Sequence, residues 1–135
     1  MSREQGSVSS TLGFAENELL ELERIEGLLD VRMKEARKRH AHSLGVARTA
    51  DKLARCYGVN RFEAVAAGLL HDWDKVLSCD EVVARAIRYG VDVAGSPKLA
   101  APLLHGPVAA HELPELFPEL PEGVFQAIDR HTVGA

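Results

Sequence analysis

The sequence is poor in aromatic residues and in cysteine. Phe, Trp and Tyr make up 5% of its 135 residues, which argues against a sheet surface that stacks exposed bases, as in many RNA-binding domains. The two cysteines, Cys56 and Cys79, are too far apart in sequence to form a Cys-x-x-Cys pair. A chain of this length can also build its core without a disulfide. We therefore expect reduced, structural thiols.

The sequence also lacks a long uncharged segment. The longest stretch without Asp, Glu, Lys or Arg, residues 99–111, is too short to span a bilayer and is interrupted by two prolines and a glycine. Residues 1–13 lack the cationic start and the apolar core of a secretory signal. These features predict a cytoplasmic protein with no membrane partner.

Positive charge is also scarce. Sixteen Lys and Arg against twenty Asp and Glu give a formal net charge of −4, so a broad basic surface for nucleic acid is not expected. With 46% apolar and 27% charged residues, the composition is that of a compact domain. We expect residues 14–135 to form this domain and residues 1–13 to be a flexible N-terminal segment.

Apolar residues recur at helical spacing, whereas strand signals are nearly absent. Residues 16–31 predict an amphipathic helix, and residues 38–57 predict a longer one that Gly58 ends. The predicted core stripe of the longer helix consists of Val46, Ala47, Ala50, Leu53, Ala54 and Tyr57.

Two capping signatures mark the starts of further helices. Asn60, with Glu63 three positions later, predicts a helix that runs to about His71. The same pattern at Ser78 predicts a helix over residues 79–89.

Prolines divide the rest of the chain. Pro97 and Pro107 fit the first turns of two short helices, and three further prolines argue against regular structure across most of residues 113–121. A last helix is predicted from about Pro121 to His131. Together these segments predict an all-α bundle of about six short helices with antiparallel neighbours.

Histidines are frequent, and two of the six fall at the ends of predicted buried stripes. In the last helix an apolar stripe that begins at Val124 leads to His131, so this imidazole should face inward. A stripe of small residues that includes Gly68 leads in the same way to His71. Small residues let another backbone approach closely, so we expect His71 to point into a helix–helix seam with Asp72 beside it.

The other four histidines are not placed by periodicity alone. His42 and His40 lie at the two edges of the apolar stripe of residues 38–57, and the pattern does not choose between them. His105 precedes a Gly-Pro pair at the mouth of a predicted helix, and His111 is not on the same helical face as His105. Two or three histidines and an aspartate that converge on one cavity would form a site for a divalent metal such as iron or manganese, or zinc.

A simpler interpretation is also available for these residues. A single inward histidine is more often a hydrogen-bonded core residue than a metal ligand, and the adjacent pair of His71 and Asp72 is weak evidence by itself. A metal site is favoured because several separate helices each supply a histidine from a buried face or a helix end.

Four segments of the chain resemble one known family in its order and approximate spacing. One of them, residues 67–75, contains the Leu-His-Asp signature of HD-domain metal-dependent phosphohydrolases. The set is more similar still to the bacterial YqeK-type branch, the symmetrical diadenosine tetraphosphate hydrolases. The resemblance begins at about Leu28 and implies an HD-domain fold. The segments are residues 39–46 (RHAHSLGV), 67–75 (AGLLHDWDK), 104–108 (LHGPV) and 128–134 (IDRHTVG).

The resemblance also implies a metal site and a substrate. The choice of His42 over His40 as a ligand rests on this match alone, and Lys75 corresponds to a lysine that is expected near a substrate phosphate. The implied cofactor is one or two divalent ions, with iron expected ahead of manganese or zinc. The implied metal ligands are His42, His71, Asp72, His105 and His131.

Hydrolysis of a phosphoanhydride needs a nucleophilic water at neutral pH and neutralisation of the charge that develops on oxygen. One or two divalent ions would meet both needs, while Asp72 would bridge them or act as a base and Lys75 would take a phosphate oxygen. Arg39 and Arg130 flank proposed ligands and are candidates for binding substrate phosphates, although a solvated helix end explains both. Symmetrical cleavage of diadenosine tetraphosphate into two ADP is implied by the resemblance alone.

The sequence departs from the family at one point. The family supplies a further aspartate ligand on a helix beyond the segment around His131, whereas this sequence ends at Ala135. Either the C-terminal helices of the domain are missing, or the last ligand comes from elsewhere, or the site is incomplete. Two other functions stay open: hydrolysis of a deoxynucleotide or a guanosine polyphosphate, and a non-catalytic nucleotide-binding module. A homodimer is also left open.

Other residues near these segments have ordinary structural explanations. Trp73 could stack on an adenine, but core packing is favoured. Asp74 either orients a neighbouring side chain or faces water, and Gly45 either allows a phosphate to approach or serves helix packing. His40 and His111 are expected to be surface or structural residues.

Overall fold

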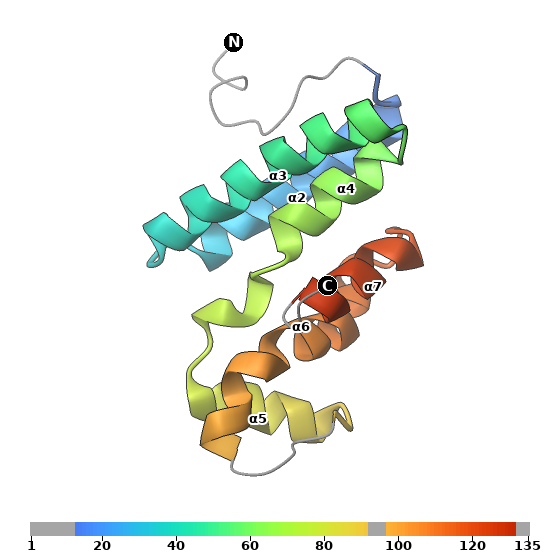
Figure 1. Cartoon of the computed structure of the whole chain (residues 1–135). Coiled ribbons are helices and arrows are strands. Elements are labelled where there is room, and N and C mark those ends of the chain that lie inside the picture. The colour runs from blue at the N-terminus through green and yellow to red at the C-terminus, as the bar shows by residue number, and fades with distance from the viewer. Residues whose placement is uncertain (1–12, 92–96, 132–135) are drawn as a thin grey trace. The chain divides into compact units, whose positions relative to one another are not determined.

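The computed structural model describes residues 13–91 and 97–131, with the backbone alone for residues 97–103, 130 and 131. Within these ranges every regular element is a helix (Figure 1), so the predicted all-α fold is confirmed. The predicted flexible segment lies outside the described residues except for Gly13. No described helix has the length and apolar character needed to cross a membrane. The elements are α2 (Glu16–Arg32), α3 (Arg37–Tyr57), α4 (Arg61–Leu70), the 3-10 helix η1 (Trp73–Val76), α5 (Cys79–Arg88), α6 (Pro97–Leu116) and α7 (Glu122–His131).

The chain divides into two compact units, Met1–Leu70 and His71–Ala135. In the first unit α3 and α4 pack along each other, and α2 packs against α4 (Figure 1). Apolar side chains from all three helices form the core of this unit. Its buried residues are Leu22, Ile25, Leu29, Met33, Ala47, Ala54, Phe62, Val65, Ala66, Leu69 and Leu70.

Three helix boundaries follow the local signals in the sequence. α3 ends at Gly58, whose φ of 71° is the left-handed conformation that favours glycine. At the start of α4 the Asn60 side chain accepts a hydrogen bond of 2.9 Å from the Glu63 amide. At the start of α5, Ser78 and Glu81 form both hydrogen bonds of a capping box. The structure confirms these predictions.

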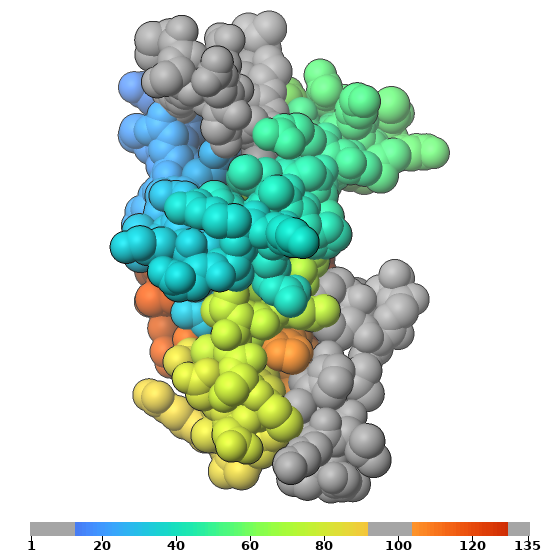
Figure 2. Space-filling view, turned by 90° about the vertical axis from the view of Figure 1, so that its left-hand side faces the viewer, coloured from blue at the N-terminus to red at the C-terminus, as the bar shows by residue number. Residues whose placement is uncertain are grey.

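The buried face of α3 differs from the predicted stripe. Ala47 and Ala54 are buried as expected, but Leu53 is 52% exposed and Tyr57 is 78% exposed. The helix instead buries a face that includes Ser43 and Asp51, and a broad stretch of α3, coloured teal to green, lies at the surface (Figure 2). The prediction was wrong for Leu53 and Tyr57 because small residues and a paired carboxylate, rather than large apolar residues, face α4.

Gly68 explains why small residues occupy this seam. A Cβ atom added at Gly68 would lie 2.7 Å from the Cα atom of Ala47 and 3.0 Å from its backbone nitrogen. The contact is with backbone, which cannot move aside as a flexible side chain can. The predicted close approach of another helix to the Gly68 stripe is therefore confirmed, and the approaching helix is α3.

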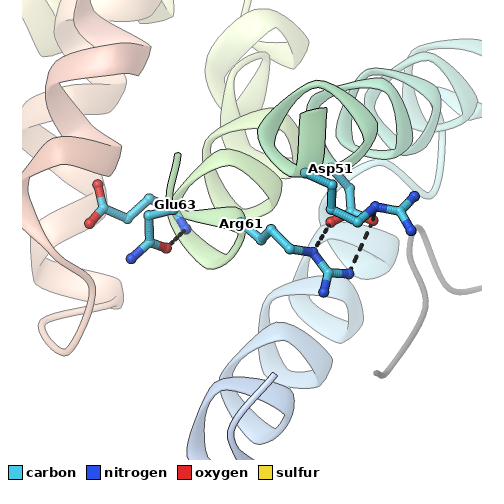
Figure 3. A network of polar contacts seen from close by, with 5 residues as sticks. Asp51, Arg61 and Glu63 are labelled. Carbon is cyan, nitrogen blue, oxygen red and sulfur yellow. Dashed lines mark hydrogen bonds and ion pairs between the residues drawn. The ribbon is translucent and has the colours of Figure 1, made fainter. Parts of the chain in front are cut away.

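A buried ion pair joins the same two helices. Asp51 on α3 is 2% exposed and accepts hydrogen bonds from the Nε atom of Arg61, at 2.7 Å, and from one of its terminal nitrogens, at 3.3 Å (Figure 3). The Arg61 guanidinium also lies over the Phe14 ring, 4.3 Å from the ring centroid. Because the carboxylate meets a guanidinium fork, its burial does not leave an uncompensated charge.

The second unit contains η1, α5, α6 and α7. α6 packs against α5, α7 and η1, and one core cluster consists of Val82, Ala86, Leu104 and Val108. Trp73 is 4% exposed and meets the Phe117 ring edge-on, with the ring centroids 6.1 Å apart. The expectation that Trp73 packs in the core is confirmed.

α6 corrects the prediction drawn from the prolines. It is one helix of 20 residues that continues through Pro102, Pro107 and Pro114, not two short helices followed by irregular chain from residue 113. Each internal proline removes a backbone hydrogen bond and costs about 3 kcal/mol. Burial of a large apolar side chain contributes about 1.5–3 kcal/mol, so the buried side chains that α6 carries offset this cost. They are Leu104, Val108 and Leu113, with Ala109 beside them.

Polar side chains also link α5 to α6. Arg85 forms an ion pair with Glu112, and the Tyr89 ring stacks on His111 with the centroids 5.9 Å apart. The Tyr89 hydroxyl donates to Glu115 at 3.3 Å. Burial, reinforced by the carboxylates of Glu115 and Glu112, raises the pKa of Tyr89 above its usual value. His111 thus has the structural role expected from the sequence.

Candidate metal centre

Three of the predicted ligands lie close together. One ligand atom from each of His42, His71 and Asp72 can be chosen so that all three atoms lie within 4.8 Å of one another. His42 is in the second turn of α3, and His71 and Asp72 directly follow the last residue of α4. The packing of α4 against α3 therefore brings these positions together although the two histidines are 29 positions apart in sequence.

The three side chains differ in their exposure. Asp72 is 4% exposed, the His71 side chain is 14% exposed, and His42 lies at the surface. The His71 Nε2 atom is 3.4 Å from the Asp72 Oδ2 atom. A buried carboxylate beside two imidazoles, one of them open to solvent, gives a centre that is anchored on one side and accessible on the other.

This donor set suits a divalent cation. Two nitrogen ligands of one such ion lie at most about 4.2 Å apart, twice the metal–nitrogen bond length, so a small side-chain adjustment would bring the three atoms onto one ion. Imidazole and carboxylate together are typical ligands of iron, manganese and zinc. A divalent metal therefore fits the residues that are present, and the donor set leaves its identity open.

Of the two further predicted ligands, the structure describes only the His105 side chain, which does not belong to the group of His42, His71 and Asp72 found among the described residues. His105 lies within α6 and is partly buried, so the expectation that it stands at the mouth of a helix was wrong. The continuous course of α6 explains this, because Pro107 lies inside the helix instead of beginning one. His131 ends α7, but its side chain lies outside the described residues.

The structure separates His40 from His42. The His40 Nδ1 atom lies 3.3 Å from Arg37 and 3.7 Å from Asp30, so this ring has a structural environment of its own. Periodicity alone did not distinguish the two histidines, and only His42 joins the group with His71 and Asp72.

The predicted phosphate-binding residues are placed only in part. Lys75 lies in η1, three positions after Asp72, and is partly exposed, as is Arg39 on α3. The Arg130 side chain lies outside the described residues. Asp74 is fully buried and does not face water, which excludes one of its two expected roles.

One feature near the centre was not expected from the sequence. A cavity of about 520 Å³, widely open to solvent, lies against α3, and its described lining residues all belong to this helix: His42, Gly45, Val46, Thr49, Ala50 and Leu53. A Cβ atom added at Gly45 would meet no described residue within 4 Å, so packing against the described helices does not require this glycine. The sequence did carry a signal, the apolar positions that follow His42, but these were assigned to the core.

The helical fold and the group of His42, His71 and Asp72 are those expected of a metal-dependent helical domain, and a known family has the same character. The chain belongs to the HD domain family, whose model matches residues 39–134.

Two curated relatives are similar to this chain, and both are named symmetrical bis(5'-nucleosyl)-tetraphosphatase. The protein from Staphylococcus aureus is 35% identical over 99 residues, which cover 72% of this chain and 50% of the relative. The protein from Halalkalibacterium halodurans is 33% identical over 96 residues, or 71% of this chain and 51% of the relative. The chain thus spans about half the length of the curated relatives it matches.

Proposed function

We propose that this chain takes part in metal-dependent hydrolysis of a nucleoside polyphosphate, and that the reaction is symmetrical cleavage of diadenosine tetraphosphate to two ADP. The observation that carries the proposal is the group formed by His42, His71 and Asp72 within an HD domain. The names of the two relatives supply the substrate class and the symmetrical outcome.

His42, His71 and Asp72 would hold the cation, with His105 and His131 as the further ligands that the family resemblance implies. Iron is the proposed metal because the family resemblance favours it, and imidazoles and a carboxylate suit iron as they suit manganese and zinc. Histidine ligands hold a cation without cancelling its charge, so the centre would still attract a polyphosphate. When bound, the divalent cation supplies Lewis acidity, which lowers the pKa of water and neutralises charge on phosphate oxygens.

The other residues have roles set by their chemistry. The Asp72 carboxylate would share in holding the cation or accept the proton from the attacking water, and its burial keeps it fixed in place. The Lys75 ammonium and the Arg39 and Arg130 guanidinium groups would bind non-bridging phosphate oxygens. Such contacts orient the tetraphosphate so that its central linkage is the one that reacts.

The proposal predicts loss of metal and of turnover when the ligands are removed. We expect protein purified without added metal to contain a divalent cation, and His71→Ala and Asp72→Ala to lower both the metal content and the hydrolysis rate. The rate should fall by more than about 100-fold, because changes to residues that only support metal ligands already cost 10–100-fold. Asp72→Ala should be the more severe, since it removes a charge as well as a ligand.

Elemental analysis and chromatography of the products check these expectations. His111→Ala is the control, because His111 is an exposed histidine that stacks on Tyr89 outside the group. Two ADP as the only products support symmetrical cleavage, and ATP with AMP would contradict it. Full activity in both ligand variants would refute the assignment of the centre.

A further inference from the structure

The apolar cavity against α3 begins at a proposed metal ligand. His42 belongs both to the lining of the cavity and to the group with His71 and Asp72. The candidate metal centre and the cavity therefore adjoin each other at His42.

The lining residues lie at successive turns of one helix face. Because an α-helix rises 1.5 Å per residue, Val46 lies about 6 Å and Ala50 about 12 Å along the axis from His42. This distance is comparable to the length of a nucleoside measured from its 5' oxygen. A substrate with a phosphate at His42 would thus place its sugar and base beside Val46, Thr49 and Ala50.

The size and chemistry of the cavity also fit a nucleoside. Its volume of about 520 Å³ lies within the usual range of small-molecule sites, about 300–1,000 Å³. The lining is mainly aliphatic, as the faces of a planar base require, and Thr49 adds a hydroxyl group. Leu53 at the far end is 52% exposed, so a bound base would remove apolar surface from water.

We propose that this cavity is the subsite for one nucleoside of the substrate. The inference rests on the proposed function, since it takes the phosphates to lie at the His42 group. It assigns to Gly45, Val46, Thr49 and Ala50 a role in recognising the part of the substrate that does not react. Affinity for the nucleotide then comes from two separable sources, phosphate at the cation and base on the aliphatic face.

Binding of ADP and of inorganic pyrophosphate to the Mn²⁺-loaded protein separates these sources. Both ligands carry a diphosphate, but only ADP carries a nucleoside. We expect calorimetric titration to show that the wild-type chain binds ADP at least tenfold more tightly than pyrophosphate. Ala50→Phe should place a phenyl ring where the base would lie and remove this difference while leaving the pyrophosphate affinity unchanged.

Lys52→Phe is the matched control, because it adds the same side chain at an exposed position of the same helix. It should bind both ligands as the wild type does. Equal affinities of the wild type for ADP and pyrophosphate, or undiminished ADP binding by Ala50→Phe, would overturn the proposal. A change of oligomeric state in Ala50→Phe without a change in ADP binding would assign this face to a second copy of the chain, and would overturn it too.

Failure of the nucleoside subsite can be distinguished from failure of the proposed hydrolytic function. If the chain hydrolyses no nucleotide but ADP binding depends on residue 50 as expected, the subsite stands and the enzymatic proposal fails. If the chain hydrolyses the dinucleotide and Ala50→Phe leaves both turnover and binding intact, the subsite alone fails.

Discussion

Asp51 is a buried carboxylate whose charge depends on a neighbouring helix. Arg61 contacts it through two nitrogens, and the Arg55 Nε atom lies 3.6 Å away. Asp51→Ala would leave the Arg61 guanidinium without this partner in a partly buried position. Because removal of one partner from a buried ion pair is strongly destabilising, we expect a loss of about 3 kcal/mol in the free energy of unfolding, measured with urea.

Asp30 provides the matched control for that experiment. It pairs with Arg37 at 2.9 Å, but the two side chains are 58% and 60% exposed. The hydrogen bond from Arg37 lowers the pKa of Asp30 below its usual value, yet solvent screens such a pair. Asp30→Ala should therefore change stability little. Similar losses for both variants would show that burial of the Asp51 pair does not determine its contribution.

At the same scale, the sequence could identify residue types but not their surroundings. Periodicity records only the angle of a side chain around its helix, and His40 and His42 lie at the two edges of one apolar stripe. What separates them is Asp30, on another helix, which lies near His40. The burial of Asp51 was likewise not predictable, because its partner Arg61 lies ten positions along the chain, beyond the end of α3.

The pairing of α3 with α4 depends on a glycine. Gly68→Ala would place a Cβ atom 2.7 Å from the backbone of Ala47, so the helices must separate. An alanine gains about 1 kcal/mol in helix propensity, but overpacking of a tight contact costs about 1–3 kcal/mol. We expect net destabilisation of about 1 kcal/mol, seen as a lower urea midpoint.

Gly27→Ala tests the same substitution without the contact. A Cβ atom at Gly27, in the middle of α2, would meet nothing within 4 Å in the part of the chain that the structure describes. Only the propensity gain then applies, and the urea midpoint should rise. Movement of both midpoints in the same direction would mean that the α3–α4 seam tolerates a methyl group.

Helices with strong end signals were predictable, and those shaped by burial were not. The glycine and capping residues around α3, α4 and α5 act within a few residues, so the sequence determines these boundaries locally. α6 passes through three prolines because its apolar residues find partners on α5, η1 and α7. Those partners are distant in sequence, so local rules predicted breaks where the helix continues.

For the whole molecule, the site was predictable mainly through resemblance. Each imidazole alone is more often structural than metal-binding, and the spacing of 29 residues between His42 and His71 has no meaning until α4 is packed on α3. The order of the four motifs along the chain indicated that histidines on separate helices belong to one site, which the periodicity of a single helix cannot indicate. The group of His42, His71 and Asp72 then arises from the fold, while the roles of His105 and His131 stay predictions.

If these three residues share a cation, the metal must stabilise the folded chain, because the unfolded chain does not hold their side chains together. At a free Mn²⁺ concentration of about 100 times the dissociation constant, the gain is about 2.7 kcal/mol. For a chain of this size, that corresponds to a rise of roughly 10 °C in the Tm. EDTA should reverse the rise, and thermal unfolding followed by circular dichroism measures it. His42→Ala should abolish the response, whereas His40→Ala, two positions away on the same helix, should keep it. An equal response in both variants would place the bound metal at other residues.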